Sequence, residues 1–196
     1  MTDHSLYSLL LLAGGKSLRM GTNKAELVYG DKTFLEHMLE KARSLKIEKC
    51  FVSGYLSPSG DVQAVPDRFP DRGPLGGIHA CMKEMDTPYC LVVPIDAPLL
   101  PLPILESLLR AHRESPQKER VLIWEHGDRK EPLIAVYPVA MAGVIEELIR
   151  ERPVPVFRVL DRWGYDCHRM ETDETEIINI NTPELYEEMR KKDKGI

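Results

Sequence analysis

The sequence lacks the marks of a membrane-bound or secreted protein. No apolar run approaches the ~20 residues that a membrane-spanning helix needs. Residues 1–4 show no basic start, and no long apolar stretch follows them as it does in a signal peptide. The four cysteines are scattered and form no C-x-x-C pair, which favours free thiols over disulfides or a zinc site. We therefore expect a cytoplasmic protein with reduced cysteines.

A basic surface is also missing. The 196 residues include 31 acidic and 26 basic side chains, which gives a formal charge of −5. This balance argues against binding to nucleic acid or to an anionic membrane, and it leaves room only for a local basic pocket that holds a small anion. The six histidines show no metal-ligand spacing, and no Ser or Cys stands in a G-x-S-x-G setting. The length suits one domain, residues 1–196.

The sequence does contain a regular alternation of strand-like and helix-like segments. Short apolar runs predict strands at residues 7–12, 47–53, 62–65, 89–95, 121–124, 133–137, 166–170 and 176–180, with a polar hairpin at 126–130. A helix begins at Thr33, which has capping-box spacing to Glu36, and further helices are expected at 73–85, 101–109, 141–149 and from 182 onward. This order predicts an α/β fold, with a three-layer, Rossmann-like, mostly parallel sheet and helices on both faces. Such sheets bind ligands at the carboxyl ends of their strands.

A glycine-rich loop follows the first predicted strand. Gly14 and Gly15 would let backbone N–H groups approach a phosphate or a base, and Arg19 and Lys24 add positive charge. The spacing is neither that of a P-loop nor that of a dinucleotide-binding loop. A nucleotide-binding loop and an ordinary turn with incidental basic residues remain equally open on spacing alone.

Carboxylates follow two other predicted strands. Asp96 stands directly after a fully apolar strand, where it could hold Mg²⁺ together with substrate phosphates, or could simply be a helix N-cap or a turn aspartate. Asp67 precedes the glycine-rich stretch 73–77 and could accept a hydrogen bond from a sugar hydroxyl or a base N–H, could support the metal, or could belong to a solvated loop. Asn179 and Asn181 place two amides at one strand end, which suits a heterocycle, although capping of the last helix explains part of this pattern.

Taken in order, these clusters resemble one family. Leu12-Ala13-Gly14-Gly15, Arg19-Met20-Gly21 and Lys24 are similar to the signature loop of the molybdenum cofactor guanylyltransferases (the molybdopterin-guanine dinucleotide biosynthesis protein A family), a branch of the nucleotidyltransferases. The resemblance continues through Asp67, the stretches 73–77 and 94–98, and the stretch 179–183, so that it spans nearly the whole chain. It departs from the family at Ser53-Gly54-Tyr55, where members often carry Asn-x-Asn.

The resemblance implies transfer of GMP from GTP to molybdopterin, with release of pyrophosphate and with Mg²⁺ as cofactor. The expected partners are these two substrates, with room for proteins of molybdenum cofactor biosynthesis or cofactor acceptors, and with no nucleic acid and no membrane. A related enzyme that uses CTP or a sugar phosphate is the nearer alternative, and a non-catalytic nucleotide-binding domain is the farther one.

The resemblance also assigns roles to individual residues. It implies nucleotide binding by Leu12, Ala13, Gly14, Gly15, Lys24, Asp67 and Asp96. It implies catalysis by Lys24, Arg19 and Asp96, with Asp96 as the metal ligand. It places Gly76, Gly77, Asn179 and Asn181 on the side of the acceptor.

Overall fold

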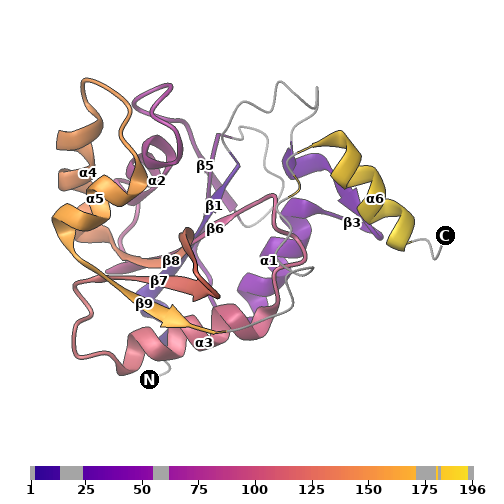
Figure 1. Ribbon diagram of the computed structural model, residues 1–196, viewed down its shortest axis with the longest axis horizontal. Coiled ribbons are helices and arrows are strands. Elements are labelled where there is room, and N and C mark those ends of the chain that lie inside the picture. The colour runs from indigo at the N-terminus through magenta and orange to yellow at the C-terminus, as the bar shows by residue number, and fades with distance from the viewer. Residues whose placement is uncertain (1–2, 14–23, 55–61, 171–179, 181, 194–196) are drawn as a thin grey trace.

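A seven-stranded mixed sheet organises the chain (Figure 1). The computed structural model describes residues 3–13, 24–54, 62–170, 180 and 182–193. The strand order is β5-β4-β1-β6-β8-β7-β9, with β1 (Tyr7–Leu12), β4 (Cys50–Ser53), β5 (Val62–Val65), β6 (Tyr89–Pro94), β7 (Val121–His126), β8 (Arg129–Pro138) and β9 (Tyr165–Arg169). Only β8 runs against its neighbours within this sheet, because it pairs antiparallel with β6 and β7 while the other pairings are parallel. The predicted mostly parallel α/β sheet is confirmed.

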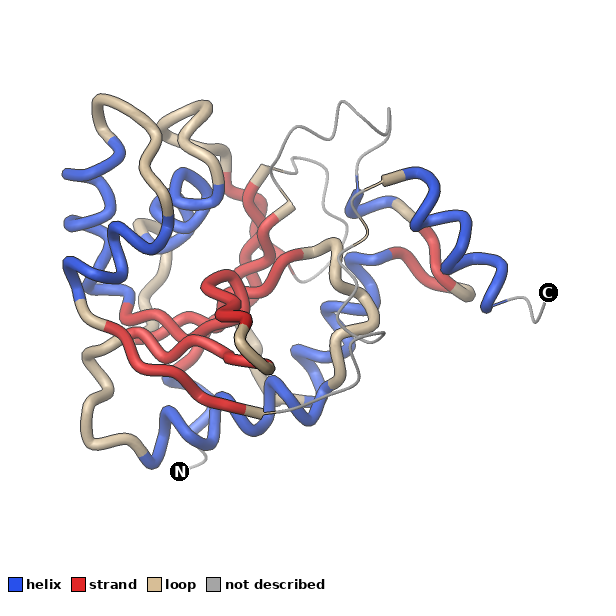
Figure 2. The backbone as a smooth tube through the Cα atoms, viewed as in Figure 1, coloured by secondary structure: helices blue, strands red, loops and turns tan. Residues whose placement is uncertain are grey.

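Helices cover both faces of the sheet (Figure 2). On one face lie α1 (Phe34–Ser44) and α3 (Leu102–Glu114), and on the other lie α2 (Pro74–Met82), α4 (Ala142–Ile149) and α5 (Val156–Trp163). The side chains of β1 alternate between the two faces, since Leu9 and Leu11 join the core of α1 and α3 while Leu10 and Leu12 join that of α2, α4 and α5. This double burial explains the continuous apolar run of β1.

The start of α1 follows the predicted capping box. Thr33 ends a small hairpin formed by β2 (Val28–Tyr29) and β3 (Lys32–Thr33). The Thr33 hydroxyl accepts a hydrogen bond from the backbone N–H of Glu36 at 3.2 Å, and the Glu36 carboxylate accepts one from the Thr33 N–H at 2.7 Å. Both bonds satisfy N–H groups that have no partner within the helix itself.

Several predicted boundaries are wrong for identifiable reasons. The strand expected from residue 47 begins only at Cys50, because α1 is followed by a reversal in which Lys46 has φ 58° and the Ile47 N–H bonds to Ala42 O. The helix expected through residue 85 ends at Met82. The polar connection expected over 126–130 is only the two-residue turn Gly127-Asp128, because β7 extends to His126 and β8 begins at Arg129. Of the strand expected at 176–180, only residue 180 is among the described residues.

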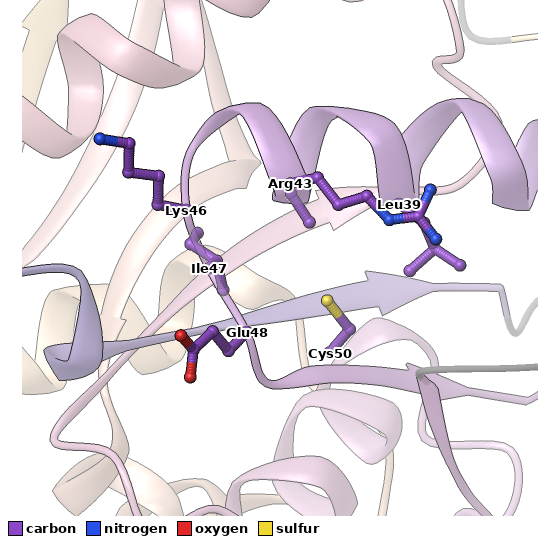
Figure 3. Close-up of a pocket in the computed structure, with 7 residues that line it drawn as sticks. Leu39, Arg43, Lys46, Ile47, Glu48 and Cys50 are labelled. Atoms are coloured by element: carbon purple, nitrogen blue, oxygen red, sulfur yellow. The ribbon is translucent and has the colours of Figure 1, made fainter.

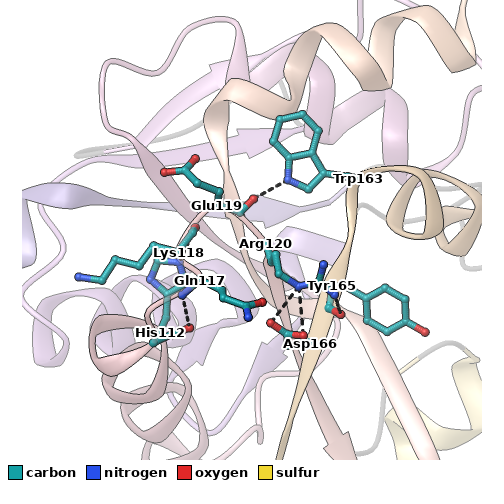
Figure 4. Close-up of polar contacts among 9 residues, drawn as sticks. His112, Gln117, Lys118, Glu119, Arg120, Trp163, Tyr165 and Asp166 are labelled. Atoms are coloured by element: carbon teal, nitrogen blue, oxygen red, sulfur yellow. Dashed lines mark hydrogen bonds and ion pairs between the residues drawn. The ribbon is translucent and has the colours of Figure 1, made fainter.

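The edge strand β9 and the preceding helix α5 are held by polar contacts (Figure 4). Arg120 donates from Nε to both carboxylate oxygens of Asp166 at 3.1 Å and from its terminal nitrogen to Tyr165 O at 2.7 Å. Trp163 donates to Glu119 O at 2.6 Å. The sequence pattern missed α5, because Pro155 and its neighbours break the apolar periodicity just before Val156.

Two general expectations can be checked on the described residues. The four cysteines are free, with Cys50, Cys81 and Cys90 buried and Cys167 exposed, as predicted. None of the helices described in the structure combines the length and the apolarity needed to span a membrane.

Candidate active site

The carboxyl ends of β5, β4, β1 and β6 share one edge of the sheet. These four neighbouring strands are parallel, and two further backbone bonds extend their pairing beyond the strand ends: Ala13 N–H to Ser53 O and Ile95 N–H to Leu12 O, both at 3.1 Å. The first residues after β1 and β6 are therefore held side by side. This edge is where parallel sheets bind ligands.

An ion pair lies at this edge. Lys24 Nζ donates to Asp96 Oδ2 at 2.6 Å, and the two side chains are only 16% and 15% exposed. Lys24 belongs to the short helix η3 (Lys24–Glu26), and Asp96 belongs to the turn after β6. Asp96 is not a helix N-cap, because α3 begins at Leu102 with Pro101 as its N-cap; it does lie in a turn, the other structural role considered for it. Sequence reasoning chose both residues, and the structure brings them together.

Three contacts fix the turn that carries Asp96. The Ala97 N–H bonds to Pro94 O at 3.4 Å, and the N–H of Ile180 bonds to Asp96 O at 2.8 Å. From α1, Lys41 Nζ donates to Pro98 O at 2.8 Å, and burial lowers the pKa of Lys41. Neither Lys41 nor Ile180 was identified from the sequence. Lys41 occupies an ordinary position of an amphipathic helix, and no local pattern distinguishes it.

Asp67 lies at the same edge but away from the ion pair. Its Oδ1 atom is buried and has no hydrogen-bond partner among the described residues, and desolvation raises the pKa of its carboxyl group. Buried polar atoms without a hydrogen-bond partner are rare in native proteins. A hydrogen bond from a bound ligand would explain why this oxygen is left without one. Three strand spacings of about 4.8 Å separate β5 from β6, so the strand ends that precede Asp67 and Asp96 are about 14 Å apart. The two carboxylates therefore suit different parts of one extended ligand.

The glycines of α2 pack tightly against this edge. A Cβ on Gly77 would overlap Ser53 Oγ and would lie 2.8 Å from Ser53 Cβ and 3.4 Å from Leu12 Cδ2. A Cβ on Gly76 would lie 3.0 Å from Phe69 O and 3.5 Å from Asp67 Oδ2. Ser53 is 1% exposed. Its side chain is therefore enclosed beneath α2, and it does not present a base-binding group in place of the Asn that family members often carry.

The described residues account for part of the predicted site. Lys24 pairs with Asp96, and Leu12 and Ala13 lie at the same edge, where their backbones bond to Ile95 and Ser53. Gly77 lies against Leu12, and Gly76 lies beside Asp67. The predicted site residues Gly14, Gly15, Arg19, Asn179 and Asn181 lie outside the described residues.

The donor set can be tested against a divalent ion. Within the described ranges, no group of three or more His, Cys, Asp or Glu side chains could hold a metal by protein ligands alone. Mg²⁺ is commonly bound by one or two carboxylates together with substrate phosphates. Lys24 bonds to Oδ2 of Asp96, and the same carboxylate has a second oxygen to offer. Asp96 therefore fits a metal that arrives with a nucleotide.

A hollow at the opposite edge of the sheet does not compete with this site. It measures about 470 Å³ and lies between the end of α1 and the start of β4, lined by Leu39, Ala42, Arg43, Lys46, Ile47, Glu48 and Cys50. Figure 3 shows that the charged side chains of Lys46, Glu48 and Arg43 point in different directions. Ligand sites have polar groups that converge, so this hollow lacks the character of an active site.

Comparisons with known proteins agree with this geometry. The family model of the MobA-like NTP transferase domain matches residues 9–163. A probable molybdenum cofactor guanylyltransferase of Rhodopirellula baltica is 34% identical over 89% of this chain and 87% of its own length.

Two solved structures share the fold. A molybdopterin-guanine dinucleotide biosynthesis protein A from Archaeoglobus fulgidus superposes with a TM-score of 0.76, at 23% identity over 96% of this chain and all of that one. A protein from Mycobacterium tuberculosis that was solved in complex with manganese has a TM-score of 0.69, at 15% identity over 95% of this chain and 98% of that one.

Proposed function

The chain belongs to the MobA-like NTP transferase domain family, and from this premise we propose that it is a molybdenum cofactor guanylyltransferase. It transfers GMP from GTP to molybdopterin and releases pyrophosphate. The observation that carries the proposal is the Lys24–Asp96 pair at the carboxyl edge of the sheet. A module that only binds a nucleotide would have no need of the proposed metal-binding carboxylate of Asp96.

The reaction needs no covalent enzyme intermediate. An oxygen of the terminal phosphate of molybdopterin attacks the α-phosphorus of GTP, and the bond from that phosphorus to the bridging oxygen of pyrophosphate breaks. The attacking phosphate is already an anion, so no strong general base is required. Catalysis then depends on alignment and on neutralising the charge that grows on the leaving pyrophosphate. Lys24 supplies a fixed positive charge for this purpose, and Arg19 is its proposed companion.

Asp96 is the proposed ligand of Mg²⁺. A structural relative of this chain was solved in complex with manganese, which is consistent with a divalent ion in this fold. When bound, the ion would supply positive charge to the phosphates. Leu12 and Ala13, followed by Gly14 and Gly15, would contact the nucleotide through their backbone.

Asp67 would accept a hydrogen bond from an N–H or O–H group of the nucleotide, which would satisfy its buried Oδ1. The acceptor would lie near Gly76, Gly77, Asn179 and Asn181. A cytoplasmic location belongs to the same proposal, because four free cysteines suit a reducing compartment. Contacts with proteins that supply or receive the cofactor would fit this role.

The nucleotide assignment is tested by thermal unfolding with GTP, CTP, ATP or UTP at equal concentration, each with Mg²⁺. A ligand that binds only the folded state raises the unfolding temperature, and at equal concentration a tighter ligand raises it more. GTP should give the largest shift, and release of pyrophosphate from GTP should require molybdopterin. An equal or larger shift with CTP would overturn the guanine assignment and favour a cytidylyltransferase.

A further inference from the structure

The C-terminal helix α6 (Pro183–Asp193) lies against the β2–β3 hairpin, apart from the main sheet (Figure 1). The Tyr186 side chain forms two hydrogen bonds to the hairpin. The Tyr186 hydroxyl donates to Val28 O at 2.9 Å and accepts from Val28 N–H at 3.1 Å. The two residues are 158 positions apart in the sequence. Tyr186 thus bonds to β2 much as a neighbouring strand would.

The hairpin geometry explains why both peptide groups of Val28 are open to Tyr186. Val28 pairs with Thr33, but the Thr33 N–H bonds to the Glu36 carboxylate, and the next bond of the hairpin runs from Phe34 N–H to Leu27 O at 2.8 Å. In an antiparallel pair, residues with and without mutual backbone bonds alternate. The peptide groups of Val28 therefore face away from β3, and Tyr186 satisfies both.

A short, stiff segment connects Val28 to Lys24. The Leu27 N–H bonds to Lys24 O at 3.3 Å and closes the turn of η3, while Ala25 and Leu27 are buried in the core. The ring of Tyr186 also packs edge-on against Phe34 at the start of α1, with ring centroids 6.1 Å apart. Because this hydrogen bond and this burial hold the segment between the two residues, a displacement of Val28 would also displace Lys24, four residues earlier in the chain.

The same C-terminal part of the chain also holds the other member of the ion pair. The Ile180 N–H donates to Asp96 O at 2.8 Å, and the Ile180 side chain is buried in the core of α1 and α3. Ile180 precedes Tyr186 by only six residues. One end of this stretch thus contacts the turn of Asp96, and the other contacts the segment of Lys24.

We propose that Ile180 and α6 together, here called the C-terminal brace, set the relative position of Lys24 and Asp96, and that Tyr186 is a positioning residue for nucleotidyl transfer. The catalytic part of this inference rests on the proposed function. Tyr186 touches no reacting atom in this proposal; it acts through Val28 and η3 on the ammonium of Lys24. Small misplacements of a catalytic group lower turnover strongly, because alignment supplies much of the rate.

The test compares Tyr186→Phe with Tyr29→Phe, a matched control in β2 whose hydroxyl, among the described residues, forms no hydrogen bond to α6. Tyr186→Phe removes only the hydroxyl and keeps the ring against Phe34. The first measurement is amide hydrogen exchange over residues 24–34, which should be faster in Tyr186→Phe and unchanged in Tyr29→Phe. The second is kcat, which should fall about tenfold in Tyr186→Phe with KM for GTP nearly unchanged.

A double-mutant cycle separates positioning from general destabilisation. In the Lys24→Ala background, Tyr186→Phe should change kcat less than about twofold, because the group that it positions is gone. A full tenfold loss in that background would overturn the proposal and leave Tyr186 a merely structural role. Unchanged hydrogen exchange over residues 24–34 would overturn it as well. If the wild-type protein turns over no nucleotide, the proposed function fails, and hydrogen exchange still decides whether Tyr186 holds the segment of Lys24.

Discussion

The close packing of Gly77 against Ser53 makes a sharp prediction. In Gly77→Ala, the new Cβ would overlap Ser53 Oγ and lie 2.8 Å from Ser53 Cβ. Ser53 is fully enclosed at the end of a central strand, so that neither side can move away freely. Overpacking of a core costs about 1–3 kcal/mol, whereas the higher helix propensity of alanine returns about 1 kcal/mol at most. We expect Gly77→Ala to lower the free energy of unfolding by up to about 2 kcal/mol.

Gly143 in α4 supplies the control, because a Cβ on Gly143 would meet nothing within 4 Å. Gly143→Ala should raise the free energy of unfolding by up to about 1 kcal/mol. Urea denaturation followed by circular dichroism measures both variants. Combining Gly77→Ala with Ser53→Ala should relieve the clash in part, since the Cβ remains, and combining it with Ser53→Gly should relieve it more. Equal stability of Gly77→Ala and Gly143→Ala, or no relief in either double variant, would refute the packing argument.

Three further predictions concern the site and the core. Asp96→Asn should keep the fold, as judged by circular dichroism, and should lower turnover about 10²-fold or more, because it removes the charge that a divalent ion needs; near-normal turnover would refute that role. Lys24→Ala should reduce kcat more than GTP affinity, and Arg19→Ala mainly the affinity; equal losses that added salt reproduces would leave only a basic pocket. Burial lowers the pKa of His112 in the folded protein. As the pH drops below about 6.5, this histidine is therefore protonated in the unfolded chain before it is protonated in the folded one, and urea denaturation should show a falling free energy of unfolding. A pH profile left unchanged by His112→Gln would contradict this.

The pH prediction has a direct structural basis. His112 is buried in α3, and its Nε2 bonds to Lys118 O at 3.3 Å (Figure 4). Because a carbonyl oxygen only accepts, Nε2 carries the proton, and Nδ1 then accepts from the Tyr7 hydroxyl at 2.8 Å. Both nitrogens of a neutral imidazole are thereby satisfied. Protonation of Nδ1 would break the bond from Tyr7 and place a charge in the core.

Local patterns were sufficient to predict the parts of the fold that depend on local physics. The bounds of β1 and β5 and the capping box of α1 agree with the sequence-based expectation, because strand burial and helix capping are determined by neighbouring residues. The start of β4 was misjudged, since the reversal at Lys46 before it requires a positive φ in a residue that is not glycine. The antiparallel direction of β8 had no separate signal, because a buried strand has the same composition in either direction.

The same distinction between local patterns and long-range contacts applies to the candidate site. Asp67 and Asp96 could be chosen from the sequence because they closely follow predicted strands, whose carboxyl ends share one edge of a parallel sheet. Lys24 could be chosen because it is a basic residue of the glycine-rich loop and matches the signature loop of the family. Lys41, Ile180 and Tyr186 could not be chosen, since each acts on a distant backbone group: Pro98 O, Asp96 O and the peptide groups of Val28. Such bonds depend on where the chain returns in space, and the donor leaves no local pattern. The charged groups of this site can therefore be predicted from the sequence, while the contacts that position them can be identified only from the folded structure.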